Sequence, residues 1–126
     1  MKFIYLIAFL LLFFGKAFSQ DGRPTSIRVT DGPILGRPGT DSMTIWARTD
    51  RQGKVNVLYG RSAKKLDQSA SFETRGAQHD YTGTLTLHGL KSNSKYYYRI
   101  EDHQLSGSFR TMPSPEAFRN PKGNPD

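Results

Sequence analysis

The stretch that decides the fold runs Leu85-Thr86-Leu87-His88-Gly89-Leu90-Lys91-Ser92-Asn93-Ser94-Lys95-Tyr96-Tyr97-Tyr98-Arg99-Ile100. Before Gly89, leucines alternate with threonines, and from Tyr96 every second residue is a tyrosine or isoleucine suited to a core. This period of two is expected of half-buried strands. In β-sandwiches, a leucine, a short polar bend and an inward tyrosine form a tyrosine corner. The ring of that tyrosine packs in the core while its hydroxyl bonds to the backbone a few residues upstream. We therefore predict that Tyr96 is such a corner, that its ring packs beside Leu90, and that Tyr98 also faces the core.

Short strands of branched and aromatic residues, separated by turn signals, are predicted along the rest of the chain. They cover Ser26–Thr30, Ile34–Gly36, Ser42–Thr49, Lys54–Tyr59, Ser69–Arg75, Tyr81–Leu87 and Leu105–Thr111. The segment Asp31-Gly32-Pro33 is expected to end or bend the first strand. Because no segment keeps a helical period, the pattern predicts an all-β fold. We expect a two-sheet antiparallel β-sandwich of the fibronectin type III or immunoglobulin-like kind over residues 25–112.

Trp46 is the single tryptophan of the chain. In its strand, Met43 and Ile45 share one face, and strict alternation puts Trp46 on the other. A lone large aromatic residue in a small sandwich usually belongs to the core, and a β-bulge could re-aim the side chain. We therefore expect Trp46 to be largely buried.

The N-terminal segment is predicted to be a signal peptide. An uninterrupted apolar run extends from Phe3 to Phe14, and Ala17 and Ser19 are the small residues that a signal peptidase requires. A membrane-spanning helix would need about 20 consecutive apolar residues, and this run is shorter. We predict that residues 1–19 are removed after Ser19, that the protein is secreted or periplasmic without a stable membrane anchor, and that residues 20–24 form a flexible start.

The C-terminal segment has a different composition. Residues 113–126 contain four prolines and no periodic pattern, which indicates a linker or extension. A linker implies something to link to, so we expect a truncated product or a fragment of a longer polypeptide. The remaining chain is large enough for one core, and the absence of cysteine excludes disulfides, thiolate metal sites and cysteine nucleophiles.

The net charge of +7 includes Lys2 and Lys16, and is +5 without these two residues. Basic residues are scattered over nearly every predicted element. Proteins that bind nucleic acid usually concentrate charge and aromatic platforms along one track, so we expect no nucleic-acid partner. Tyr97 and Arg99 share the outward face of their strand and are the candidate surface contacts. The sandwich itself is expected to be a monomer.

Catalytic motifs are absent from the sequence. His79, His88 and His103 each lie beside a predicted turn, without the spacing of a metal site, and their role is left open. No serine lies in a Gly-x-Ser-x-Gly elbow. We therefore predict no catalytic, cofactor-binding or metal-ligating residue in this chain.

Six segments, taken in order, form a recognisable combination. They are Asp31-Gly32-Pro33-Ile34-Leu35-Gly36, Asp41-Ser42-Met43-Thr44-Ile45-Trp46-Ala47-Arg48-Thr49, Val57-Leu58-Tyr59-Gly60, Leu87-His88-Gly89-Leu90, Tyr96-Tyr97-Tyr98-Arg99-Ile100 and Gly107-Ser108-Phe109-Arg110-Thr111. Over about residues 27–121, they resemble the N-terminal domain of the alkaline phosphatase D family. Purple acid phosphatases and generic fibronectin type III modules have a similar sandwich.

The resemblance implies a fibronectin-like sandwich that precedes a metallophosphatase domain. In that family the divalent metals and the catalytic groups belong to the later domain, within motifs such as Gly-Asp-x-x-Asp and Gly-Asn-His-Glu, which do not occur here. The expected function is therefore a non-catalytic accessory domain of an exported phosphatase or phosphodiesterase, with a metallophosphatase domain as its partner in cis. The alternative is a free-standing exported module that binds protein or carbohydrate.

Overall fold

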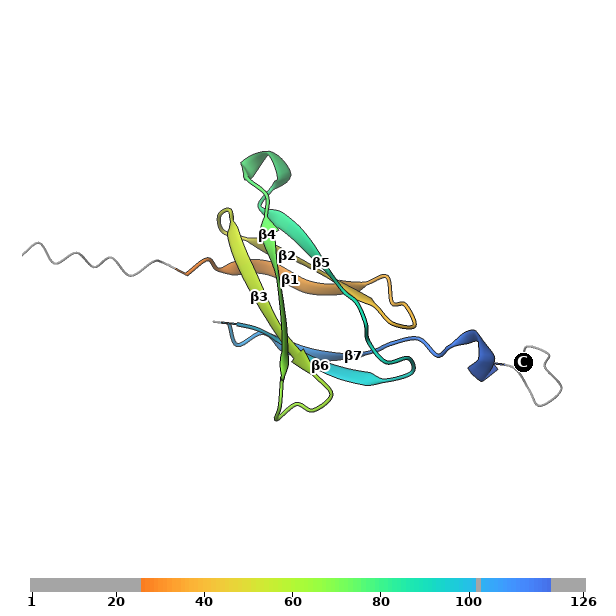
Figure 1. Cartoon of the computed structure of the whole chain (residues 1–126). Coiled ribbons are helices and arrows are strands. Elements are labelled where there is room, and N and C mark those ends of the chain that lie inside the picture. Colours follow the sequence, from red (N-terminus) through yellow and green to blue (C-terminus); the bar gives the residue numbers. More distant parts are fainter. Residues whose placement is uncertain (1–25, 102, 119–126) are drawn as a thin grey trace, which may run out of the picture.

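Seven strands in two antiparallel sheets form the molecule (Figure 1). The computed structural model describes residues 26–101 and 103–118, so the predicted signal peptide, the flexible start and the last eight residues of the chain lie outside the described part. The strands are β1 (Val29–Gly36), β2 (Met43–Thr49), β3 (Gly53–Gly60), β4 (Gln68–Thr74), β5 (Thr82–Leu87), β6 (Lys95–Ile100) and β7 (Ser106–Arg110). Two short 3₁₀ turns, η1 (Ala77–His79) and η2 (Pro115–Phe118), complete the elements. The predicted two-sheet β-sandwich is confirmed.

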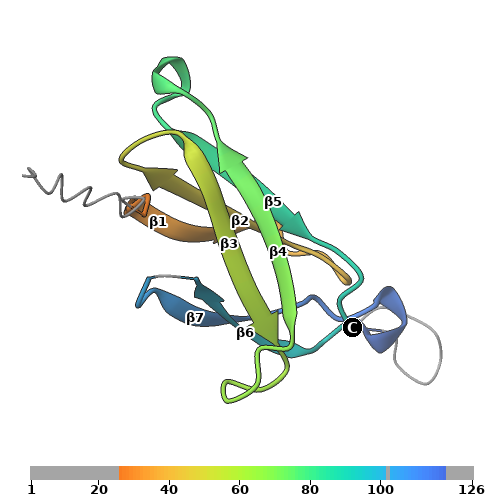
Figure 2. The ribbon, with the colours of Figure 1, turned by 60° about the vertical axis from the view of Figure 1, so that its left-hand side comes forward.

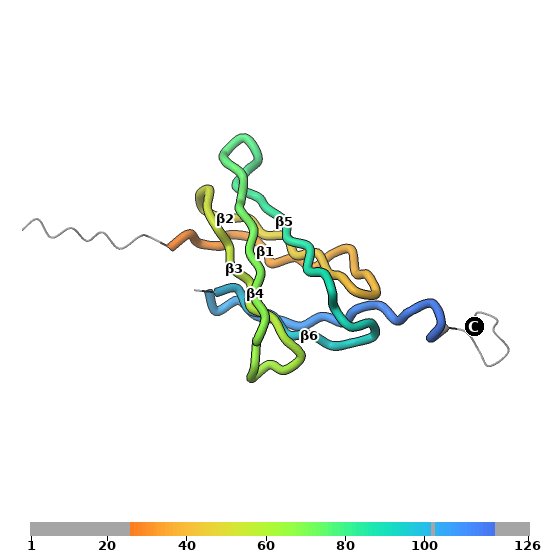
Figure 3. Tube along the Cα trace, viewed as in Figure 1, coloured from red at the N-terminus to blue at the C-terminus, as the bar shows by residue number. Residues whose placement is uncertain are grey.

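The two sheets differ in size. One has the order β1-β2-β5 and the other the order β4-β3-β6-β7. The chain enters at one end of the sandwich and leaves at the opposite end, as the traces from two directions show (Figures 2 and 3). Residues 113–118 therefore lie at the end where β1 and β7 finish.

The core forms because each strand alternates between a buried and a more exposed side chain. In β2 the residues Met43, Ile45 and Ala47 are buried, and their neighbours are only partly buried. The buried apolar set is Met43, Ile45, Ala47, Val55, Val57, Tyr59, Phe72, Leu87, Leu90, Tyr96, Tyr98, Ile100 and Phe109. Burial raises the pKa of both Tyr59 and Tyr98, because a buried phenolate would lose its hydration.

Two buried threonines join the sheets. Thr49 of β2 and Thr74 of β4 are 1% and 0% exposed, and their hydroxyl oxygens lie 2.9 Å apart. The Thr49 hydroxyl lies 2.7 Å from the backbone carbonyl oxygen of Arg51, and the Gly53 N–H donates to the Thr74 hydroxyl at 3.1 Å. Each buried hydroxyl is thus satisfied, so the link between the sheets carries no unpaired polar group.

The prediction that the first strand ends or bends at Asp31-Gly32-Pro33 is only partly right. β1 is one strand that continues through this segment, with register shifts between Val29 and Asp31 and between Asp31 and Ile34. Gly32 has a φ of +93° in this segment, a conformation that side-chain-bearing residues rarely adopt. The turn signals therefore mark bulges within an edge strand and not its end.

Trp46 is covered in part but is not in the core, where the expectation placed it. Trp46 follows the strict alternation of β2, lies on the outer side of the three-stranded sheet and is only partly buried. The two register shifts occur in β1, and the β2 ladder to β5 runs without interruption from Met43 to Arg48. No bulge in β2 therefore turns Trp46 inward.

Candidate interaction surfaces

The tyrosine corner has the expected geometry. Tyr96 is 4% exposed, and its hydroxyl accepts a hydrogen bond of 2.9 Å from the backbone N–H of Lys91, five residues upstream. Leu90 is 5% exposed and belongs to the same core cluster. The Tyr96 ring stacks on Phe109 with 5.6 Å between ring centroids and 14° between ring planes, and Phe109 also packs against Tyr98. The corner fixes the connection between β5 and β6 to the core.

The chain leaves the sandwich through a segment that is held on both sides. The backbone N–H of Met112 donates to the carbonyl oxygen of Gly39 at 2.9 Å, and the Met112 carbonyl accepts from Asn93 at 3.0 Å. The buried hydroxyl of Thr111 donates to the Lys91 carbonyl at 2.6 Å and accepts from the Ser94 N–H at 3.0 Å. The exit is therefore anchored to the loops that follow β1 and β5. The Met112 side chain is 46% exposed at this end.

The outer face of the three-stranded sheet carries an exposed apolar centre. Ile34 of β1 lies directly opposite Trp46 of β2, and Trp46 lies opposite Thr84 of β5, so the three form one row across the sheet. Ile34 is 57% exposed, and it and Met112 are the large apolar residues that the described part of the chain exposes most. Thr44 and Thr86 occupy the next row, with their hydroxyl oxygens 3.0 Å apart. We call the row of Ile34, Trp46 and Thr84 the apolar row.

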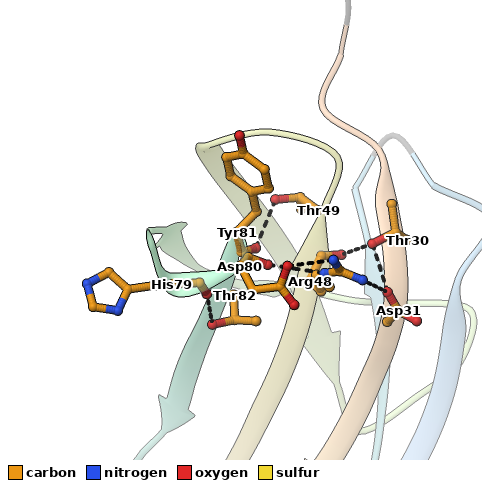
Figure 4. A network of polar contacts seen from close by, with 8 residues as sticks. All are labelled: Thr30, Asp31, Arg48, Thr49, His79, Asp80, Tyr81 and Thr82. Atoms are coloured by element: carbon orange, nitrogen blue, oxygen red, sulfur yellow. Dashed lines mark hydrogen bonds and ion pairs between the residues drawn. The ribbon is translucent and has the colours of Figure 1, made fainter. Parts of the chain in front are cut away.

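Charges beside the apolar row neutralise one another. Figure 4 shows the guanidinium of Arg48 between the carboxylates of Asp31 and Asp80, which come from β1 and from the turn after η1. The Arg48 Nη1 lies 3.2 Å from the Asp31 Oδ2, and its Nε also donates to the Asp80 carbonyl oxygen. These hydrogen bonds, first the one to Asp80, raise the pKa of Arg48. Because the groups are exposed, the pairs stabilise the fold little. Two further charges of opposite sign, Glu73 and Arg75, line a hollow with Trp46 and Thr84.

The outer face of the four-stranded sheet holds Tyr97 and Arg99, the residues expected to be outward. Tyr97 is partly buried and Arg99 is exposed. The Nζ of Lys95 lies 5.0 Å from the Tyr97 ring centroid, a cation–π contact. Arg99 lies opposite Leu58 of β3 and Ser106 of β7. The two residues thus belong to one continuous surface.

The three histidines are not brought together. His79 ends η1, His88 follows β5 and His103 lies in the turn before β7, and His79 and His88 are exposed. Within residues 26–101 and 103–118, no group of three His, Cys, Asp or Glu side chains is close enough to hold a metal ion. The same residues include no helix long and apolar enough to cross a membrane.

These strands and sheets define the chain as an antiparallel β-sandwich domain. Residues 16–113 match the model of the family described as PhoD-like phosphatase, N-terminal domain. The chain therefore belongs to this family. The match ends at Pro113, one residue after the anchored Met112.

Individual proteins and solved structures are similar to parts of this chain. Purple acid phosphatase 21 of Arabidopsis thaliana is 32% identical over 82 residues, which are 60% of this chain and 19% of that protein. The structure of PhoD is similar with a TM-score of 0.57 and 20% identity, over 65% of this chain and 19% of that one. The sensor domain of the anti-sigma factor RsgI4 from Pseudobacteroides cellulosolvens has a TM-score of 0.49 and 13% identity, over 70% and 96% of the two chains. The chain thus covers about a fifth of the length of both phosphatases.

Proposed function

We propose that this sandwich is the non-catalytic N-terminal accessory domain of an exported PhoD-like phosphatase or phosphodiesterase, present here without its metallophosphatase domain. The family match over residues 16–113 is the observation that carries the proposal. Divalent metals and the catalytic groups would belong to the domain that follows in the longer chain. The free-standing binding module is not favoured by these comparisons.

The anchored exit supports a defined junction between two domains. Thr111 and Met112 are hydrogen bonded to two different loops, so the direction in which the chain leaves is set by the sandwich. Residues 113–126 therefore start toward a following domain from a fixed point of the sandwich. A further contact between the two domains would be needed to fix their relative position.

The apolar row is the surface that we propose to pack on the metallophosphatase domain. Ile34 lies near the end of β1, and the loop after β1 supplies Gly39, which binds Met112 at the exit. Ile34 of the apolar row is therefore five residues before Gly39, the residue that bonds to the exit. The exposed Ile34 and the paired charges of Arg48, Asp31 and Asp80 suit burial against protein, and the two other charges beside Trp46, Glu73 and Arg75, are of opposite sign.

The first test is the reading frame beyond the codon for Asp126, together with a phosphoesterase assay of residues 20–126 with added divalent metals. We expect downstream metallophosphatase motifs and no activity above a blank. A downstream frame without those motifs would overturn the family role. Robust activity of the sandwich alone would overturn its non-catalytic role.

The second test replaces Ile34 by threonine, which keeps a β-branched side chain in the strand. In the sandwich alone, Ile34→Thr should leave the melting temperature nearly unchanged, because Ile34 is 57% exposed. In the longer protein the same change should lower the melting temperature and increase amide exchange in β1 and β2. An equal effect in both proteins would contradict docking through the apolar row.

A further inference from the structure

A hollow of about 350 Å³ opens on the outer face of the four-stranded sheet, between β6, β7 and the loop that joins β3 to β4. Its lining includes Tyr97, Arg99, Ser106 and Ser108 from the sheet and Ala63 and Leu66 from the loop. We call it the Tyr97 hollow. Figure 2 shows this loop below β3 and β4 and next to the start of β6.

Topology gathers basic residues around the hollow that are far apart in the sequence. Lys64 and Lys65 lie between the two lining residues of the loop, and Arg99 lines the hollow itself. Lys95 lies over the Tyr97 ring. Within the described residues, the lining contains no Asp or Glu, and no ion pair involves any of these four basic residues.

The arrangement of these charges is unfavourable for the sheet alone. Lys95 of β6 lies directly opposite Arg110 of β7, and like charges in this position destabilise a sheet. The Arg110 guanidinium bonds only to the carbonyl and side-chain oxygens of Asn93 within the described part, so its charge is not neutralised by a carboxylate there. Glu101 shares a neighbouring hollow with Arg99, and Asp67 follows Leu66, but neither lines the Tyr97 hollow. Arg99 in the lining and Lys95 over the Tyr97 ring are the positive charges that a bound anion would meet there.

We propose that the Tyr97 hollow binds a phosphate ester. The planar guanidinium of Arg99 can bond two phosphate oxygens, and the lysines add charge. Ser106 and Ser108 are exposed hydroxyl donors at the same wall. The partly buried Tyr97 ring offers an apolar platform for the organic part of the ester, since carbon–hydrogen faces pack on aromatic rings. This site lies within the sandwich and does not depend on the docking of another domain.

The test is a titration of ¹⁵N-labelled residues 20–126 with glucose 6-phosphate, with glucose and with inorganic phosphate as separate arms. Glucose 6-phosphate should shift the amides of residues 97–99 and 106–108, and added salt should weaken binding. Inorganic phosphate should shift the same amides with lower affinity, and glucose should leave them in place. Shifts of equal size with glucose, or no shift of these amides with either phosphate, would overturn the proposal.

Two variants separate a built site from general attraction to a basic surface. Arg99→Gln should weaken glucose 6-phosphate binding by about tenfold or more. Lys54→Gln is the matched control, because Lys54 is an outward residue of β3 that lies opposite Glu73 and outside the hollow. Both variants should retain the melting temperature of the parent. Equal losses in the two variants, or tighter binding of a single-stranded oligonucleotide that shifts amides over the whole basic surface, would show a diffuse electrostatic effect in place of a site.

Discussion

Removal of one oxygen atom tests the tyrosine corner most directly. In Tyr96→Phe, the backbone N–H of Lys91 loses the hydroxyl that accepts its hydrogen bond at 2.9 Å. The ring stack on Phe109 is kept, because phenylalanine retains the aromatic face. An unsatisfied donor at a partly buried position should lower the free energy of unfolding by about 1–2 kcal/mol. For a domain of this size the melting temperature should then fall by roughly 5–15 °C.

The assay is thermal and urea unfolding of residues 20–126, followed by circular dichroism, together with amide exchange at Lys91. Tyr97→Phe is the matched control. The Tyr97 hydroxyl makes no hydrogen bond within the described residues, and its contact with Lys95 involves only the ring. This variant should therefore unfold like the parent.

The reasoning is refuted if Tyr96→Phe and Tyr97→Phe have the same stability within error. It is also refuted if the Lys91 amide exchanges at the parental rate in Tyr96→Phe. A loss of stability without faster exchange at Lys91 would assign the cost to repacking of the ring and not to the hydrogen bond.

Two further predictions concern the core. Gly83→Ala should cost about 1–3 kcal/mol by overpacking, because a Cβ at Gly83 would lie 2.6 Å from the Phe72 ring. Gly36→Ala is the control, because no atom lies within 4 Å of its new Cβ, and it should be neutral or slightly stabilising in urea unfolding. Equal losses of stability in the two glycine variants would contradict this reasoning. Burial raises the pKa of Tyr59 and Tyr98, because the folded protein favours their neutral forms. Their contribution to the free energy of unfolding is complete below the ordinary pKa of 10.0, and it is lost as the pH rises through the raised pKa values. Tyr98→Phe should therefore raise the pH at which the domain unfolds in alkali, as measured by circular dichroism. An unchanged midpoint pH of alkaline unfolding would contradict this.

The elements that the sequence predicts well are those fixed by local rules. Alternation placed Tyr96 and Tyr98 inward and Tyr97 and Arg99 outward, as the burial of β6 shows. The corner needs only a leucine, a bend and an inward tyrosine close together in the chain, so it is visible without knowledge of the second sheet. The strand predicted over Ser69–Arg75 is present as β4, at an edge of its sheet.

The predictions that fail involve competition between a local rule and a general tendency. For Trp46, alternation indicated the outward face, and the usual burial of tryptophan argued against it. The alternation was right because the β2 ladder contains no bulge that could shift its phase. The buried threonine pair is a different case. Thr49 and Thr74 look like surface residues in the sequence, and their contact with each other depends on the approach of β2 to β4, which sequence patterns do not show.

The two proposed surfaces constrain one another. If the metallophosphatase domain packed on the four-stranded sheet, it would bury Lys95 and Arg99, which have no carboxylate partners in the described part of the chain. Burial of an unpaired charge is costly, so that domain would have to bring acidic groups of its own. Packing on the apolar row would keep Arg48 paired with Asp31 and Asp80, and the two further charges beside Trp46, Glu73 and Arg75, are of opposite sign. Protection of β1 and β2 from exchange, with the Tyr97 hollow still open to phosphate esters, is therefore the combination expected of the longer protein.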